Sequence, residues 1–250
     1  MLIVLPPSET KSPDGDGPAL ELGELSFPQL TATRERVARA LAQVSRNPKR
    51  AMASLAIGPR QVGELQANLD LLAAPTRPAI ERYTGVLFDA LDATGLGAAA
   101  RERASTRLAV CSALFGLVRA DDAIPAYRLS AGSKLPRIAS LPALWKPKLA
   151  PVMRNLAREQ LVIDLRSGAY RALAPIDGAL TVRVLSERPD GTRGIVSHFN
   201  KATKGAVARL LVDHDAACQS AGDVATVVRA AGHVVEQPGE RQLDVVLPPA

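Results

Sequence analysis

The sequence predicts an α/β fold of the mixed α+β kind, in which helices flank a central mixed sheet within one compact domain, residues 1–250. Three patterns predict it. Short apolar runs of strand length recur along the chain, segments with helical periodicity separate them, and an Asp-Gly pair lies between two runs of alternating polarity. A length of 250 residues suits one large domain, and no repeat or long linker divides it.

The first half of the chain begins with an apolar run at residues 2–5, which predicts a buried strand. A loop follows, because its Pro and Gly residues repeatedly stop regular structure. In residues 33–44 apolar side chains recur at helical spacing with charged residues between them, so an amphipathic helix is expected. More helices follow, which makes the chain helix-rich near residues 31–104.

In the second half, strands and helices are expected to alternate, as in βαβ units. Asn200 is the expected N-cap of one of these helices. In order, the expected elements are a buried strand from residue 107 into a turn at Gly116, a helix at 146–157, a strand at 161–165, a hairpin with strands at 180–186 and 194–199 around Asp190-Gly191, helices at 201–212 and 224–231, and a strand at 245–247.

Composition argues against several classes of protein. The apolar N-terminal run is too short for an export signal, and no window approaches the ~18 to 20 apolar residues that span a bilayer. A cytoplasmic protein without a membrane partner is therefore expected. Cys111 and Cys218 are flanked by apolar or small residues, which predicts buried free thiols.

Signatures of metal and cofactor sites are also missing. Among the three histidines only His214 has carboxylates beside it, and adjacent residues on a helix point in different directions. The sequence lacks the motifs of common hydrolases, P-loop nucleotidases and dinucleotide-binding dehydrogenases. We therefore expect neither a metal nor a cofactor.

The positive charge of the chain is concentrated in one stretch. The net charge is +6, and residues 101–150 alone carry nine basic and three acidic side chains. Such a block indicates a negatively charged partner, and phosphate binding is the specific form of that interpretation. An ordinary solvated face explains the same count, so both interpretations stay open.

Polar side chains follow the predicted strands at the points where the strands end. Open α/β sheets bind ligands at such ends, which makes these residues candidates for a binding site. The alternative is that they are the polar residues of ordinary loops. The groups are Ser8, Glu9 and Lys11 after the first strand, Ser112 and Gly116 after the second, and Ser167 and Tyr170 after the third.

Two further segments carry candidates for anion binding. Tyr127 can stack on a base or ring while the neighbouring Arg128 binds phosphate or carboxylate. Near the start of a later helix, Lys201, Lys204 and Arg209 oppose the helix dipole, which an anion bound there would explain. A surface Arg beside a partly buried Tyr, and an ordinary exposed helix, are the alternatives.

Residues 55–65 resemble the hairpin of a helix-hairpin-helix motif, in which a Gly between two short helices lets backbone N–H groups reach a DNA phosphate. Gly58 and Arg60 fit the turn, while Val62 and Leu65 fit the packing positions. The second glycine of that hairpin is replaced by Pro59-Arg60. A plain helix-Gly-Pro-helix connection fits as well, because Gly ends helices and Pro starts them.

An ordered series of motifs resembles the YaaA-type peroxide stress resistance family, over essentially residues 1–215. Phe115 replaces a Tyr of that family, Ala169 stands where an acid is usual, and the C-terminal residues align poorly. The matching segments are Met-Leu-Ile-Val-Leu-Pro-Pro-Ser-Glu-Thr-Lys at 1–11, Tyr83-Thr84-Gly85, Ser-Ala-Leu-Phe-Gly-Leu-Val-Arg at 112–119, Ile-Pro-Ala-Tyr-Arg-Leu at 124–129, Trp145, Asp-Leu-Arg-Ser-Gly-Ala-Tyr at 164–170, and His-Phe-Asn-Lys-Ala-Thr-Lys-Gly at 198–205.

The resemblance implies a mixed α/β fold with a positively charged cleft and DNA binding without strong sequence preference. It also implies protection of DNA during peroxide stress, partly by keeping reactive iron low. The expected partner is double-stranded DNA or another phosphate-bearing ligand. The expected DNA- or anion-binding residues are Lys11, Gly58, Arg60, Ser112, Tyr127, Arg128, Ser167, Lys201, Lys204 and Arg209.

The alternative hypothesis is an enzyme that acts on a small phosphorylated or carboxylated metabolite in a basic pocket of Ser, Tyr, Lys and Arg. Tyr and Lys can transfer protons when burial shifts their pKa values. The candidate catalytic residues are Ser8, Lys11, Tyr127, Tyr170 and Lys201. Convergence of the basic residues in a closed pocket favours the enzyme, and an open groove favours DNA.

Overall fold

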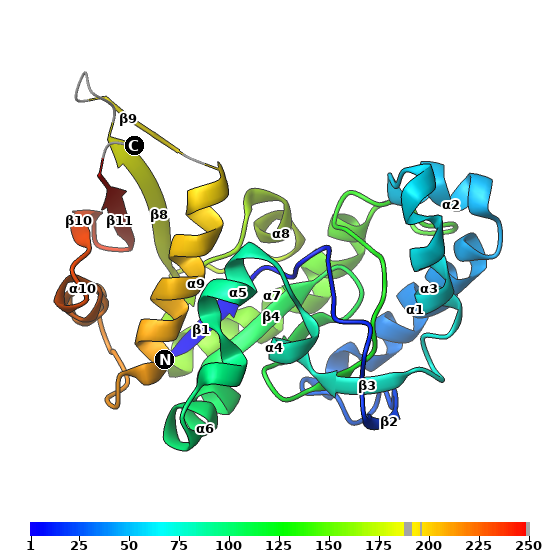
Figure 1. Cartoon of the computed structure of the whole chain (residues 1–250), viewed down its shortest axis with the longest axis horizontal. Coiled ribbons are helices and arrows are strands. Elements are labelled where there is room, and N and C mark those ends of the chain that lie inside the picture. The colour runs from blue at the N-terminus through cyan, green and yellow to red at the C-terminus, as the bar shows by residue number, and fades with distance from the viewer. Residues whose placement is uncertain (188–191, 196, 249–250) are drawn as a thin grey trace.

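Among the described residues, five strands that run in the same direction form the middle of the main sheet (Figure 1). In sheet order they are β11 (Gln242–Leu247), β8 (Leu180–Glu187), β7 (Val162–Asp164), β1 (Leu2–Leu5) and β4 (Leu108–Ser112). Antiparallel strands complete the sheet: β10 (Val234–Gly239) beside β11, β5 (Gly116–Arg119) beside β4, and β9 (Arg193–Ile195) beside the end of β8. This computed structural model describes residues 1–187, 192–195 and 197–248, with only the backbone at 195 and 197–199.

Helices cover both faces of this sheet, so the predicted mixed α/β class is confirmed. On one face, α9 (Ser197–Asp213) contacts both α5 (Val86–Leu91) and α6 (Ala98–Arg107). The connection from β1 to β4 and the connection from β5 to β7 run in opposite directions across the sheet. Because such connections are right-handed, the second one places α7 (Leu141–Glu159) on the face opposite α5 and α6.

The helix-rich segment predicted near residues 31–104 is also confirmed. It holds α1 (Thr31–Ser45), α2 (Pro48–Leu55), α3 (Leu65–Leu69), α4 (Ala79–Arg82), α5 and α6, with 3₁₀ helices at η2 (Pro59–Glu64) and η3 (Ala93–Gly95). A short 3₁₀ helix, η1 (Pro28–Leu30), precedes it. The remaining helices are α8 (Gly168–Leu173) and α10 (Ala221–Ala230). In Figure 1, α1, α2 and α3 form a lobe at one end of the molecule.

The four residues of β1 are fully buried, because parallel neighbours flank the strand and helices cover its two faces. The buried apolar side chains form one contiguous core, to which residues between Met1 and Val245 contribute. Cys111 and Cys218 are buried free thiols, as predicted. Among the described residues no helix has the length and apolar character needed to cross a membrane.

Two buried arginines hold the loops around the sheet, and neither was predicted. Arg34 of α1 donates hydrogen bonds to the carbonyls of Ser26, Phe115 and Leu117. Arg82 of α4 donates to the carbonyls of residues 12, 14, 75 and 124, which fixes the loop that leaves β1. The same region forms a small sheet of β2 (Gly17–Ala19), β3 (Pro75–Pro78) and β6 (Ala123–Ile124), which sequence patterns missed because its strands are short and contain Pro.

Gly205 allows α9 to pack closely against α5. A Cβ atom built on Gly205 would lie 2.0 Å from the carbonyl oxygen of Leu87. We expect Gly205→Ala to lower the unfolding free energy by about 1–3 kcal/mol, because the backbones of the two helices must separate. The measurement is urea denaturation.

Gly222→Ala on α10 is the matched control, since its nearest neighbour, Ser220 Oγ, lies at an ordinary 3.6 Å. It should change the unfolding free energy by less than about 1 kcal/mol. Equal stabilities of the two variants would contradict the close approach of α5 and α9.

The prediction of a strand over 194–199 is wrong in its second half. Strand β9 ends at Ile195 and α9 begins at Ser197, so Asn200 lies inside the helix and does not cap it. The reason is that the helical periodicity begins before residue 201. Asn200 lies four residues before the buried Lys204 and therefore on the same face of α9. Strands β8 and β9 pair antiparallel as predicted, while the turn predicted at Asp190-Gly191 lies outside the described residues.

Candidate functional site

The carboxyl ends of β1, β4 and β7 lie side by side, because β1 pairs in parallel with both neighbours. The chain leaves β1 toward the β4 side of the sheet and leaves β7 toward the β8 side. Two adjacent strands whose connections diverge create the crevice at which open α/β sheets bind ligands. The polar groups predicted at the strand ends therefore meet at one edge, which we call the strand-end site.

Lys11 lies near the centre of the strand-end site. Its Nζ donates to the carbonyls of Ser8 (2.9 Å) and Glu9 (3.3 Å). The same nitrogen lies 4.2 Å from the ring centre of Tyr127 and 5.4 Å from that of Tyr83. Burial lowers the pKa of Lys11 to about 7, and the nearby charge of Arg128 adds to that effect. A large fraction of this amine is therefore neutral near pH 7.

Two buried tyrosines form the wall beside this amine. The hydroxyls of Tyr83 and Tyr127 are 2.8 Å apart and hydrogen-bonded. Burial raises the pKa values of both phenols, so both remain protonated at neutral pH. The hydroxyl of Ser112 bonds to this pair and also accepts from the N–H of Phe115. The Phe115 ring packs edge-on against Tyr127, so the position where the family has a Tyr contributes only an apolar surface.

The low pKa of Lys11 predicts a pH-dependent stability. The folded-state pKa is below the unfolded value, so between about pH 7 and 10 the unfolded chain binds more protons and the unfolding free energy rises with pH. Lys11→Met removes this dependence. The melting temperature of the variant minus that of the wild type should thus be largest at or below pH 7 and fall toward pH 10, as measured by thermal unfolding.

Lys201→Met is the control, because Lys201 is exposed on α9. The Lys11→Met difference should change with pH more than the Lys201→Met difference does. A Lys11→Met difference that does not change with pH would show that burial does not lower the pKa of Lys11.

Arg128 connects the strand-end site to the α1–α3 lobe. Its guanidinium pairs with Glu9 (2.9 Å) after β1 and with Glu64 (3.3 Å) at the end of η2. The buried amide of Asn68 accepts from the N–H of Arg128 and donates to its carbonyl, which fixes the backbone. Sequence patterns missed these partners, since nothing local relates Asn68 or Glu64 to Arg128.

A buried ion pair stands at the end of β7. Arg166 donates to both carboxylate oxygens of Asp164 at 2.8 Å, and it also contacts the sulfur of Cys111 and the carbonyl of Tyr170. Burial lowers the pKa of Arg166, but its hydrogen bonds with Asp164 outweigh that effect and keep the pKa raised. Burial raises the pKa of the Cys111 thiol, which therefore stays protonated.

Comparison with known proteins places most of the chain in one family. The family model described as "Peroxide stress protein YaaA" matches residues 1–236. The chain belongs to the YaaA peroxide stress protein family. A UPF0246 protein of Corynebacterium efficiens is 48% identical over 240 residues, which cover 94% of this chain and 95% of the relative. A UPF0246 protein of Streptomyces coelicolor is 43% identical over 239 residues, covering 94% and 92%.

Membership of the YaaA family gives the protein a general role in the peroxide stress response. The motifs that carried the resemblance coincide with the strand-end site. Residues 1–11 supply β1 and Lys11, residues 112–119 supply Ser112 and Phe115, and residues 164–170 supply the ion pair. The family pattern thus describes one three-dimensional site.

Some predicted site residues lie apart from it or are engaged in other contacts. Gly58 just before η2, Arg60 on η2 and Lys201 on α9 are exposed. Ser167 is exposed just before α8. Arg209 pairs with Asp92 and Asp213 and donates to three carbonyls, which ties α9 to the end of α5. Roles for these residues in binding DNA or an anion stay predictions.

Most arginines of the basic stretch at 101–150 have partners within the protein. Arg101 pairs with Glu81 and Asp121, and Arg103 pairs with Asp215. Arg107 and Arg119 donate to backbone carbonyls. The charges of Arg101 and Arg103 are thus compensated by acidic partners, while the guanidinium groups of Arg107 and Arg119 are engaged in hydrogen bonds within the fold.

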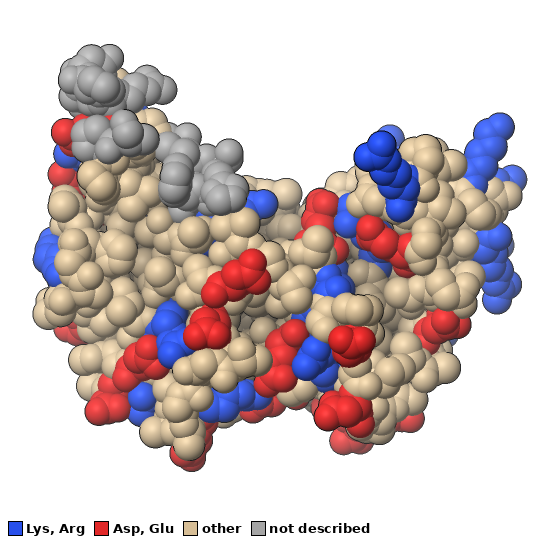
Figure 2. Space-filling view, viewed as in Figure 1, with Lys and Arg blue, Asp and Glu red and all other residues tan. Residues whose placement is uncertain are grey.

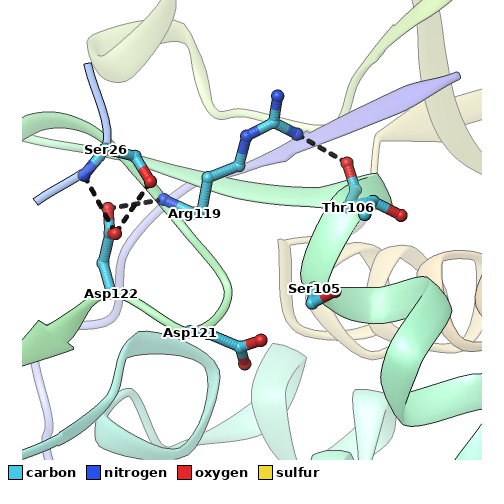
Figure 3. Close-up of a pocket in the computed structure, with 6 residues that line it drawn as sticks. All are labelled: Ser26, Ser105, Thr106, Arg119, Asp121 and Asp122. Atoms are coloured by element: carbon cyan, nitrogen blue, oxygen red, sulfur yellow. Dashed lines mark hydrogen bonds between the residues drawn. The ribbon is translucent and has the colours of Figure 1, made fainter.

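Figure 3 shows a surface pocket of about 420 Å³ at a different place. It lies where β5 ends, and β5 is antiparallel to β4, so this is the edge opposite the strand-end site. Its main carboxylate, Asp122, accepts from the N–H and hydroxyl of Ser26 and from the N–H of Arg119. Through these bonds Asp122 joins the loop at Ser26 to the end of β5, which is a structural role.

Proposed function

We propose that this protein binds duplex DNA without strong sequence preference on its α1–α3 lobe and protects the bound DNA during peroxide stress. The observation that carries the proposal is a run of residues, 36–63, that holds six basic side chains and no acidic one. In the fold this run forms most of α1, all of α2 and all of η2 except its last residue. Figure 2 shows Lys and Arg side chains gathered over this lobe, beside a hollow in the surface.

The cations of this lobe are available to an external anion. Lys49, Arg50 and Arg60 are exposed, and none of them forms an ion pair with another described residue. The loop at 130–137 adds Lys134, whose N–H bonds to the Ser54 carbonyl at 2.7 Å. We define the cationic lobe as Arg36, Arg46, Lys49, Arg50, Arg60 and Lys134. Lys and Arg that neutralise phosphates supply most of the affinity of non-specific DNA binding.

The turn after α2 adds to the support. Ala56 adopts the left-handed conformation that ends α2, and Gly58 precedes Pro59 at the start of η2. Nothing lies within 4 Å of a Cβ built on Gly58, so the backbone there is open to close approach. The N–H of Gly58 donates to Oε1 of Gln61, so a phosphate that binds this turn as in a helix-hairpin-helix would displace the Gln61 side chain, with Arg60 beside it.

The test is a gel shift with two duplexes of unrelated sequence at low salt. We expect both to bind with affinities within a few-fold of each other, and binding to weaken steeply as salt rises. Absence of binding at low salt would overturn the proposal. Protection is tested by strand nicking in iron and peroxide, which the bound protein should reduce.

Limitation of free iron stays a prediction from the family resemblance. The described residues contain no group of three or more His, Cys, Asp and Glu side chains placed to hold a metal ion. The protection proposed here is the one that contact with DNA provides.

A second candidate function is an enzyme acting on a small phosphorylated or carboxylated metabolite. The observation that favours it is the grouping of Lys11 with the Tyr83–Tyr127 hydroxyl pair at the sheet edge. An amine near its pKa beside protonated phenols can exchange protons with a ligand. A metabolite that raises the melting temperature of the wild type, but not of Lys11→Met, would support this function.

A further inference from the structure

Lys204 on α9 is a buried cation without a partner. The residue is 8% exposed, and its ammonium forms no hydrogen bond or ion pair with a described residue. Burying an unpaired charge is costly, and buried polar groups are almost always hydrogen-bonded. The cationic lobe does not explain this group, because Lys204 is on α9, at the carboxyl end of β7.

Two neighbouring polar atoms are also unsatisfied. Nε of Arg171 on α8 is buried without a hydrogen-bond partner, and the nearest carboxylate oxygen, on Asp164, is 3.8 Å away. Both oxygens of Asp164 already accept from Arg166. One turn before Lys204, Oδ1 of Asn200 is buried and accepts no hydrogen bond. Asn200 lies one turn before Lys204 on α9, and Lys204 and Arg171 both lie near Asp164, so one bound molecule that reaches all three side chains would complete them.

We propose that Lys204 and Arg171 bind the phosphate of a phosphate monoester, with Asn200 accepting a hydrogen bond from the ligand. The charge of the site sets the class of ligand. Lys204, Arg171 and Arg166 carry three positive charges against the one negative charge of Asp164. A monoester with a charge of about −1.5 to −2 balances this excess, whereas a carboxylate or phosphodiester carries only −1.

Burial favours a terminal or free phosphate over an internal phosphate of a duplex. An internal phosphate is attached to sugars on both sides, whereas a monoester is attached on one side and approaches a side chain that is 8% exposed with its free oxygens first. The monoester is therefore a free phosphorylated metabolite or the terminal phosphate of a DNA strand. The position of the subsite, at the crevice where the connections of β1 and β7 diverge, is where open α/β sheets place phosphate ligands. It goes beyond the duplex binding proposed above.

The experiment uses inorganic phosphate as the probe, in calorimetric titrations of the full chain in a phosphate-free buffer. We expect the wild type to bind, Lys204→Met to bind at least ten-fold more weakly, and Lys148→Met, exposed on α7, to match the wild type within two-fold. A gel shift then compares duplexes with 5′-phosphate and 5′-hydroxyl ends. A preference for the phosphorylated end that Lys204→Met abolishes identifies DNA termini, and equal affinities identify a free monoester.

Failure of the wild type to bind phosphate, together with equal binding of both duplexes, would overturn the proposal. So would undiminished phosphate binding by Lys204→Met. Thermal melting without phosphate checks folding: Lys204→Met should melt at the wild-type temperature or about 2–4 °C above it, because an unpaired buried charge is removed. Binding of the 5′-hydroxyl duplex reports only on the duplex proposal, so it can be retained in Lys204→Met while phosphate binding is lost.

Discussion

Replacing Lys49, Arg50 and Arg60 together by Gln is expected to lower the affinity for duplex DNA by about 10²- to 10³-fold at 0.1 M salt. All three cations are exposed, and none is paired within the fold. Each phosphate contact releases counterions worth about one power of ten at this salt, so three contacts account for the loss. The measurement is fluorescence anisotropy of a labelled duplex.

A matched variant removes three cations elsewhere. Lys146, Lys148 and Arg154 are exposed on α7, which covers the other face of the sheet from α9. Their replacement by Gln lowers the net charge equally and should change the affinity by less than about ten-fold. Equal losses in the two triple variants would mean that net charge alone, and no particular face, attracts DNA.

Asp164→Ala is expected to lower the unfolding free energy by about 3–5 kcal/mol, because it leaves the buried guanidinium of Arg166 without its counter-ion. Arg166 is fully buried and its two bonds to Asp164 are both 2.8 Å long. The sulfur of Cys111 and the carbonyl of Tyr170 cannot replace a carboxylate charge. Urea denaturation measures the loss.

The double variant Asp164→Leu with Arg166→Met separates the cost of a lone charge from the loss of the pair. Replacing both partners by apolar side chains should recover most of the stability, leaving it within about 2 kcal/mol of the wild type. A double variant as unstable as Asp164→Ala would show that the pair stabilises the end of β7 by a contribution beyond charge compensation.

The sequence predicted the sheet and its helices well where local patterns are strong. The apolar run at residues 2–5 is β1, and the alternating run at 180–186 is β8 with one more residue. Local patterns failed where distant contacts decide the structure. Strand β3 begins and ends with Pro and exists because β2 and β6 pair with it, and Asn200 is helical because α9 begins earlier than its polar residues suggest.

The candidate site was predicted in part. Strand ends and family motifs pointed to Lys11, Ser112 and Tyr127, which the fold brings together. Glu9 and Glu64 as partners of Arg128 required the fold, because these contacts depend on how separate loops meet. The pairing of Arg166 with Asp164 is local, two residues apart, and sequence patterns missed it all the same.

The distribution of charge gives a further lesson. Counting in long blocks drew attention to residues 101–150, where Arg101 and Arg103 have acidic partners in the fold. A count in blocks of fifty residues conceals the basic run at 36–63. Acidic residues on both sides of the run, at 9–35 and 64–92, cancel its charge within the first two blocks. Whether a cation is available to a partner depends on its neighbours in space.

The salt dependence of duplex binding tests the central claim most directly. With the six cations of the cationic lobe on phosphates, the logarithm of the affinity should fall with the logarithm of the salt concentration with a slope of about −5. The slope should drop to about −2 to −3 in the Lys49, Arg50 and Arg60 triple variant. A wild-type slope near zero, or equal slopes for the two proteins, would contradict duplex binding by this lobe.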